Sequence, residues 1–245
     1  MSLVEKFKDV MISKFNMSMI GELNFFLGLQ VVQKVEGIQI HQQKYLREII
    51  KKIGMENRKP LYTLAATGTK LDVDLHSKKS NETFYRGMVG SLMYLTASRS
   101  DIVFAVSLYA RFQSDPRELH VAISKRIFRY LKGTDNLCLW YPKNCYFTLV
   151  GYTDTYYAGY LVDRKSTSAM AQFLGPCLVS WGSRKQNSVV ASTTQAEYIT
   201  VACCCAQLLW LKQQFKDFGF LMGSIKIRCD NTSAINSSKN HVHHF

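Results

Sequence analysis

The first part of the chain alternates between helical and strand-like spacing of its apolar positions. From residue 3 to 17, apolar residues recur every three or four positions, which predicts an amphipathic helix. An apolar run at 25–32 predicts a strand, residues 35–37 a turn, and residues 38–41 the returning strand of a hairpin. A second helix is expected over about 43–53.

A block of helices follows a polar linker. Residues 57–81 lack periodicity, whereas apolar stripes over 82–97 and 102–112 predict two helices. Asp115 and the proline after it predict the start of a third helix, with Asp as the N-cap and Pro in the first turn, and Gly133 marks its end. The apolar face expected of this third helix is Leu119, Ala122, Ile123, Ile127 and Leu131.

The same helix carries a row of basic residues outside its apolar face. They are Arg117, Lys125, Arg126, Arg129 and Lys132. A row of this kind is either a solvated face or a surface that meets phosphate groups, and the spacing fits both interpretations.

From residue 146 the pattern changes to strands, which predicts a second folding unit with its boundary near 142–146. The elements expected are strands at 147–153, 167–174 and 178–181, a polar link at 182–187, a helix from Ser192 to about Phe218, a strand at 225–229 and a short helix at 232–236. The long helix begins with a capping box, because Ser192 is followed three residues later by Gln195. The order of elements is therefore βββαβα.

Three carboxylates occupy comparable places in this second unit. Asp154 is expected to end the first strand, Glu197 to lie in the first turn of the long helix, and Asp230 to end the fourth strand. If the first and fourth strands are neighbours, these groups meet and repel one another unless cations neutralise them. Oxygen ligands suit Mg²⁺, and two such ions about 4 Å apart promote phosphodiester hydrolysis.

Each of the three acids also has an ordinary explanation. Asp154 fits a turn, because Asp is a common turn former. Glu197 fits a helix N-terminus through the macrodipole, and Asp230 fits a turn or the cap of the next helix. The spacing alone favours neither interpretation.

Composition and charge narrow the class of protein. The net charge of +13 suits a polyanionic partner such as nucleic acid, although many basic proteins are merely soluble. No apolar run is long enough to span a membrane, and the charged opening segment is not a signal peptide. Seven cysteines without a CxxC pair indicate a reduced intracellular protein, in the cytoplasm or nucleus, with Cys203, Cys204 and Cys205 as small core residues.

A series of ordered motifs carries a resemblance to a known family. They are GELNFFLGLQV, YRGMVGSLMYLTASRSDI, ARFQSDPRELH, RIFRYLKGT, LWYPK, VGYTDTYYAG, DRKSTS, QFLG, VSWGSRKQNSV, STTQAEY and CDNTSAI. With these motifs the whole chain resembles the C-terminal part of the polyprotein of copia-type LTR retrotransposons, namely the end of the reverse transcriptase followed by the RNase H domain.

The resemblance implies an α+β fold in three parts. Residues 1–60 would be the end of the polymerase palm with a hairpin like the primer grip, 61–145 a linker and helical thumb or connection, and 146–245 an RNase H-like mixed sheet with flanking helices, truncated at its C-terminus. The implied catalytic and metal-binding acids are Asp154, Glu197 and Asp230, with Mg²⁺ or Mn²⁺ as the cofactor. The implied nucleic-acid contacts are Phe26, Leu27, Gly28, Lys125, Arg126, Arg129, Lys132, Arg164 and Lys165.

The chain also departs from the family pattern. It has no YxDD motif, so polymerisation by this chain alone is not expected, and the upstream polymerase region is an expected partner. Tyr156 and Tyr160 stand where acids are usual, Ala169 replaces a glycine, Gln195 an acid and Ser100 a proline. The ending HVHHF lacks the family's fourth acid and closing helix; its histidines, His241, His243 and His244, are interpreted as a remnant of that segment rather than a metal site.

These features predict a fragment that acts on the RNA strand of an RNA–DNA hybrid by two-metal hydrolysis, with weak or absent activity. Two alternatives stay open. One is a catalytically decayed remnant that binds nucleic acid, and the other is a host-captured interaction module. Cleavage of a hybrid, its retention without cleavage, and salt-sensitive binding distinguish the three.

Overall fold

The computed structural model describes residues 3–19, 21–64, 72–74 and 76–240. Its helices are α1 (Leu3–Lys14), α2 (Gln43–Lys52), α3 (Glu82–Leu95), α4 (Val103–Tyr109), α5 (Glu118–Gly133), α6 (Thr193–Asp217) and α7 (Thr232–Lys239), with short 3₁₀ turns η1 (Ser100–Ile102) and η2 (Ala110–Phe112). Its strands are β1 (Phe25–Phe26), β2 (Leu29–Lys34), β3 (Gly37–His41), β4 (Leu139–Pro142), β5 (Leu149–Tyr156), β6 (Thr167–Leu174), β7 (Cys177–Lys185) and β8 (Lys226–Arg228). The chain is α+β, with two four-stranded sheets in the described part.

The first sheet has the order β1-β2-β3-β4 and is antiparallel throughout. The single strand expected over 25–32 is divided in two by a turn at Leu27 and Gly28, whose φ angles are 48° and 78°. Positive φ at both central residues is the requirement of a type I′ hairpin turn. The pattern of apolar residues runs straight through this turn, so it could not reveal it.

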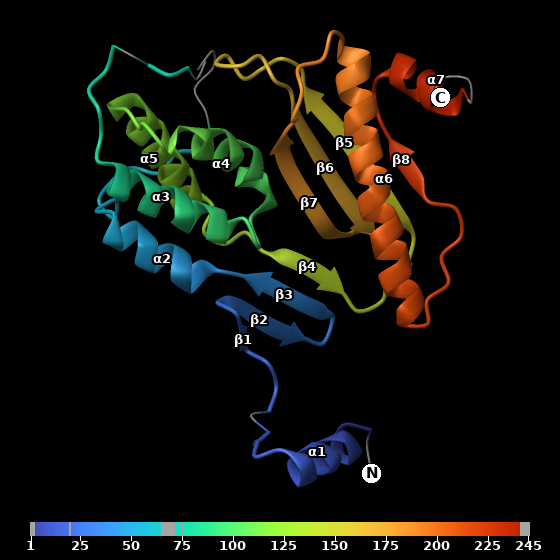
Figure 1. Cartoon of the computed structure of the whole chain (residues 1–245). Coiled ribbons are helices and arrows are strands. Elements are labelled where there is room, and N and C mark those ends of the chain that lie inside the picture. The colour runs from blue at the N-terminus through green and yellow to red at the C-terminus, as the bar shows by residue number, and fades with distance from the viewer. Residues whose placement is uncertain (1–2, 20, 65–71, 75, 241–245) are drawn as a thin grey trace.

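Strand β4 joins the first sheet from far along the chain. It pairs with β3, with Leu139 opposite Ile40 and Pro142 opposite Gly37. The part expected to be a helical linker and thumb, 61–145, therefore ends in a strand of the N-terminal sheet (Figure 1).

A helical block made of α2, α3, α4 and α5 contains the larger core of the chain. Its most deeply buried apolar side chains are Leu46, Met88, Leu92, Leu95, Ile102, Val106, Ile127, Phe128 and Leu131. Helix α1 contributes nothing to this core, because none of its side chains is buried. It lies apart from the block in Figure 1.

The start and the buried face of α5 differ from the sequence expectation. The helix begins at Glu118 with Arg117 as its N-cap, because the Asp115 carboxylate binds the Arg117 guanidinium (2.8 Å) instead of capping the helix. Leu119 is 40% exposed and Ala122 is also exposed. The buried face instead includes His120, Ser124 and Phe128.

The second sheet has the order β7-β6-β5-β8, with β5 parallel to β8 and the other pairs antiparallel. The first and fourth strands of the unit, β5 and β8, are neighbours, which is the condition under which the acids were expected to meet. Helix α6 crosses one face of this sheet (Figure 1). Gly151 permits the close contact between them, because a Cβ at this position would lie 2.7 Å from the Cys204 Sγ.

Two further details of this unit differ from the sequence expectation. Of the three consecutive cysteines only Cys204 is buried; Cys203 and Cys205 are exposed. Strand β7 continues to Lys185, so most of the expected polar link is strand.

The other face of this sheet packs against the helical block through polar contacts. The Trp181 indole N–H donates to the Thr96 carbonyl at 3.0 Å, and the Arg111 guanidinium donates to the Thr167 hydroxyl at 2.8 Å. Tyr160 joins an apolar cluster with residues of the block. The second sheet and the helical block thus share an interface, and the chain passes from the first sheet to the second through residues 143–148.

Within the described ranges, no helix has both the length and the apolar character required to cross a membrane.

Candidate metal and nucleic-acid site

The N-terminal end of α6 positions Glu197 against the second sheet. The Ser192 hydroxyl caps the helix by accepting from the Gln195 N–H at 3.1 Å, as predicted. The Gln195 side chain accepts from the Ala191 N–H rather than from that of Ser192. The helix starts at Thr193, so Glu197 lies just beyond the first turn, with 6% of its surface exposed.

A buried polar layer fixes this end of the helix to the strands. The Thr200 hydroxyl lies 2.6 Å from both the Thr155 and the Ser168 hydroxyls. The Gln186 amide donates to the Ser168 hydroxyl at 3.0 Å and to the Ala196 carbonyl at 2.9 Å. These bonds leave the helix little freedom to rotate, so the direction of Glu197 is set by the sheet.

Glu197 meets two residues that follow β8. One ligand atom from each of Glu197, Cys229 and Asp230 lies within 4.8 Å of the others. The Cys229 thiol donates to the Glu197 carboxylate over 3.7 Å. Two of the three predicted acids therefore come together, with a thiol that sequence reasoning had not selected. The only signal for Cys229 is its place directly before Asp230.

Asp154 lies differently from the expectation. Strand β5 runs on to Tyr156, so Asp154 is inside the strand and not at its end. Thr155 faces α6 through its bond to Thr200, and alternation along the strand sends Asp154 to the opposite face. Asp154 does not belong to the group of ligand atoms formed by Glu197, Cys229 and Asp230. Tyr152 of β5 lies opposite Arg228 of β8, so the same parallel register continued by two residues places Asp154 level with Asp230.

The electrostatics of the site follow from this arrangement. Burial raises the pKa of Glu197, and the negative charges of Asp230 and, to a smaller extent, Asp154 raise it further. Hydrogen bonds from Thr155 and Cys229 oppose the rise in this pKa without cancelling it. Glu197 ionises with difficulty because it is buried near two other acids. A bound cation would stabilise its charged form.

On the Asp154 side, the face of the second sheet that is turned toward the helical block borders a cleft of about 550 Å³ against η1 and α4. Its lining includes Asp101, Phe104, Tyr152, Asp154, Phe173 and Trp181. The Tyr156 ring beside it makes an edge contact with Phe104, with ring centroids 5.8 Å apart. Sequence reasoning missed this cleft because its two walls are distant along the chain.

The two tyrosines that stand in place of family acids have separate surroundings. Tyr156 is half exposed at the cleft, whereas Tyr160 is 7% exposed in the cluster between the two units. The Arg111 guanidinium and the Lys185 ammonium each lie 4.9 Å from the centre of the Tyr160 ring. Burial raises the pKa of Tyr160, so it stays neutral and serves as packing.

The predicted primer-grip residues form the tip of the first hairpin. Phe26 and Leu27 are 53% and 77% exposed. The Tyr94 hydroxyl donates to the Leu27 carbonyl at 2.6 Å and holds the turn against α3. A Cβ at Gly28 would lie 1.7 Å from this hydroxyl, so only glycine fits.

The basic row of α5 binds the chain itself. Arg126 donates to the Thr63 hydroxyl at 2.6 Å, Arg129 to the Lys59 carbonyl at 2.8 Å, and Lys132 to the Arg58 carbonyl at 2.9 Å. These cationic groups hold the segment 56–63, so the basic row is not a purely solvated face.

The remaining basic candidates have other positions. The Lys125 ammonium lies 5.9 Å from the centre of the Phe84 ring. Arg164 is exposed in a turn with φ of 56°, and the backbone N–H of Lys165 donates to the Asp163 carboxylate at 3.1 Å.

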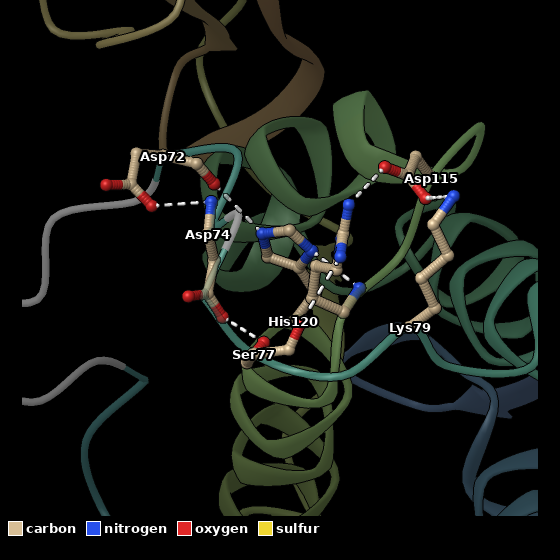
Figure 2. A network of polar contacts seen from close by, with 7 residues as sticks. Asp72, Asp74, Ser77, Lys79, Asp115 and His120 are labelled. Carbon is tan, nitrogen blue, oxygen red and sulfur yellow. Dashed lines mark hydrogen bonds and ion pairs between the residues drawn. The ribbon is translucent and has the colours of Figure 1, made fainter.

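A polar network holds another part of the linker on α5 (Figure 2). The His120 ring accepts from the Arg117 N–H through Nδ1 (3.0 Å), which leaves Nε2 protonated and donating to the Asp72 carbonyl (3.0 Å). Asp115 binds both Arg117 and Lys79. The linker thus lacks periodicity yet has fixed contacts. The histidines at 241, 243 and 244 lie outside the described residues.

Known proteins have similar sequences over nearly the whole chain. Residues 1–66 match the family described as reverse transcriptase (RNA-dependent DNA polymerase). The chain is 34% identical over 244 residues to the retrovirus-related Pol polyprotein from transposon RE1 of Arabidopsis thaliana, covering 99% of the chain and 17% of that protein. It is 33% identical to the corresponding polyprotein from transposon TNT 1-94 of Nicotiana tabacum, covering 99% of the chain and 19% of that protein.

A shorter relative matches over most of both lengths. An uncharacterized mitochondrial protein of Arabidopsis thaliana is 32% identical over 203 residues, which cover 81% of this chain and 82% of the relative. By contrast, the chain spans less than a fifth of the two transposon polyproteins. The chain therefore belongs to the family of copia-type retrotransposon Pol polyproteins and corresponds to a segment of them.

Proposed function

We propose that the second unit is an RNase H-like nuclease domain that hydrolyses the RNA strand of RNA–DNA hybrids. The observation that supports this most is the meeting of Glu197 and Asp230 beside the parallel β5–β8 pair, with the pKa of Glu197 raised by burial and by its acidic neighbours. In this proposal the first sheet and the helical block are the palm end and the thumb of the reverse transcriptase.

The donor set fits a hard divalent cation. Carboxylate oxygens are the ligands that Mg²⁺ and Mn²⁺ prefer, and Glu197 and Asp230 would hold the ion, with Asp154 as a third carboxylate from the neighbouring strand. Such an ion would activate water and stabilise the leaving oxygen. Cys229 would orient Glu197 through its hydrogen bond.

The rest of the chain would position the hybrid. The positive net charge of +13 attracts the phosphate backbone over a long range, and contacts to backbone and 2′-hydroxyl groups need no base sequence. The exposed Phe26 and Leu27 would contact the primer end. Because Arg126 and Arg129 already hold the linker, the thumb would meet phosphate only if these contacts open.

The test is cleavage of a labelled hybrid with Mg²⁺ or Mn²⁺, compared among Glu197→Gln, Asp230→Asn and Asp154→Asn. We expect each variant to lose about 10²-fold or more in rate, as for other active-site electrostatic groups. Asp217→Asn, at the exposed far end of α6, is the matched control and should keep full activity. Equal cleavage by the wild-type and by the three site variants would contradict the proposal.

A second candidate function is hybrid binding without cleavage. It is favoured by the position of Asp154, which lies outside the group formed by Glu197, Cys229 and Asp230. In the same assay it predicts retention of the intact hybrid, weakening with salt, and no difference between wild-type and Asp154→Asn.

A further inference from the structure

Two cysteines from separate segments face each other where the chain passes between the sheets. The Cys145 Sγ and the Cys177 Sγ are 4.0 Å apart, and neither forms a disulfide. Cys145 lies in the connection between β4 and β5, and Cys177 is the first residue of β7. They are 32 positions apart in sequence, so only the fold brings them together.

The backbone around the two thiols fixes this proximity. The Gly175 N–H donates to the Thr148 carbonyl at 2.8 Å, and the first residue of β5, Leu149, pairs with Leu174 of β6. The β6–β7 turn is thereby bound to the segment that carries Cys145. Disulfide formation needs a sulfur separation of about 2.05 Å, so each sulfur has to move by only about 1 Å.

The two thiols differ in their access to solvent. Cys145 is partly exposed between exposed residues, whereas Cys177 is 4% exposed. Burial and the neighbouring thiol raise the pKa of Cys177, which keeps it protonated and unreactive toward reagents in solution. An oxidant would therefore reach Cys145 first.

We propose that Cys145 and Cys177 are an oxidation site, at which a hydroperoxide converts the pair to an intramolecular disulfide. The Cys145 thiol loses its proton, and the thiolate sulfur attacks the terminal oxygen of the peroxide, breaking the O–O bond and forming a sulfenic acid. The other oxygen takes up the proton lost by the thiol and leaves as water or an alcohol. The Cys177 thiol then displaces hydroxide from that sulfur, and its proton leaves with the hydroxide as a second water. The peroxide is reduced by two electrons and the two thiols are oxidised by two.

The disulfide would connect the two units of the chain. Cys145 follows β4 of the first sheet, and Cys177 begins β7 of the second. The Tyr141 hydroxyl of β4 already donates to the Leu178 carbonyl of β7 at 3.0 Å, so the new bond would reinforce an existing contact. In the oxidised protein the connection 143–148 can no longer move away from the second sheet.

Peptide mapping of the peroxide-treated chain tests the proposal. Trypsin cleaves after Lys143, Arg164, Lys165 and Arg184, so the two cysteines fall in separate peptides, 144–164 and 166–184. We expect these peptides linked, at a mass about 2 Da below their sum, and separated by a reducing agent. Cleavage after Lys143 should also become slower in the oxidised monomer.

Matched variants distinguish this pair from the other thiols. Cys145→Ser and Cys177→Ser should each abolish the linked peptide, whereas the double variant of the exposed Cys203 and Cys205, both to Ser, should keep it. A sulfinic or sulfonic acid at Cys145 without any linked peptide would overturn the proposal. A linked peptide found only in covalent dimers would overturn it as well.

Discussion

Replacing Asp101 by Asn should destabilise the helical block through the loss of one ion pair. The Asp101 carboxylate accepts from the Arg99 guanidinium at 2.9 and 2.7 Å and from the Tyr130 hydroxyl at 2.8 Å. Arg99 is only 5% exposed, and its other bonds are to the carbonyl and hydroxyl of Thr134. An asparagine keeps one oxygen acceptor and loses the charge.

The magnitude follows from the burial of the two partners. Breaking a buried pair by removing one charge costs about 3–5 kcal/mol. Because the Asp101 side chain is 29% exposed, water compensates part of the loss, and we expect about 2 kcal/mol. For a chain of this size that lowers Tm by about 4–8 °C.

The cost should depend on pH. Burial acts to raise the pKa of Asp101, but the hydrogen bonds and charge of Arg99 and the bond from Tyr130 outweigh it, so the pKa is lowered. A lowered folded-state pKa contributes stability above the unfolded carboxyl pKa of about 3.9, and this stability is lost as the pH falls through the folded value. The difference between wild-type and variant should therefore shrink in acid.

Urea unfolding of both proteins at pH 7 and in acid measures this difference. Glu82→Gln is the matched control, because its ion pair with Arg86 is exposed on both sides and should contribute less than about 0.5 kcal/mol. If Asp101→Asn costs no more than Glu82→Gln at pH 7, or if its cost does not fall in acid, the reasoning from burial is refuted.

Three further changes test the second unit. Gly151→Ala should cost about 1–3 kcal/mol in urea unfolding, because a Cβ would lie 2.7 Å from the Cys204 Sγ under α6; an unchanged midpoint would show that the helix yields freely. Glu197→Gln without divalent ions should raise Tm at neutral pH, because the raised pKa makes the charged form unfavourable; the gain should vanish below the unfolded carboxyl pKa, and a gain that persists there would contradict this cause. Trp181→Phe should cost about 1 kcal/mol by loss of its N–H bond to the helical block, and a fully stable variant would mean that water replaces this bond.

Local chemistry made part of this fold predictable from the sequence. The bounds of β6 and the cap at Ser192 agree with the structure, because period-two alternation and capping boxes are decided within a few residues. The pairing of β5 with β8 could only be assumed, because it joins segments that are distant along the chain.

Long-range contacts explain what the sequence did not reveal. Asp154 lies inside β5 and not at its end because the strand extends to Tyr156, and this end is set by pairing with β6 rather than by the strand's own residues. Arg126 and Arg129 were expected to meet phosphate, yet their partners are backbone and side-chain oxygens of the linker, which has no periodic pattern to identify it.

Strand β4 is translated long after β3, the strand with which it pairs, and this order has a consequence during synthesis on the ribosome. The edge of β3 is covered only when residues 139–142 pair with it, after the whole helical block has been made. Until then Gly37–His41 presents unpaired N–H and C=O groups, which are a template for strand addition by another chain. A translation product that stops before residue 139 would carry this edge permanently and should aggregate, whereas one that stops after Pro142 should not.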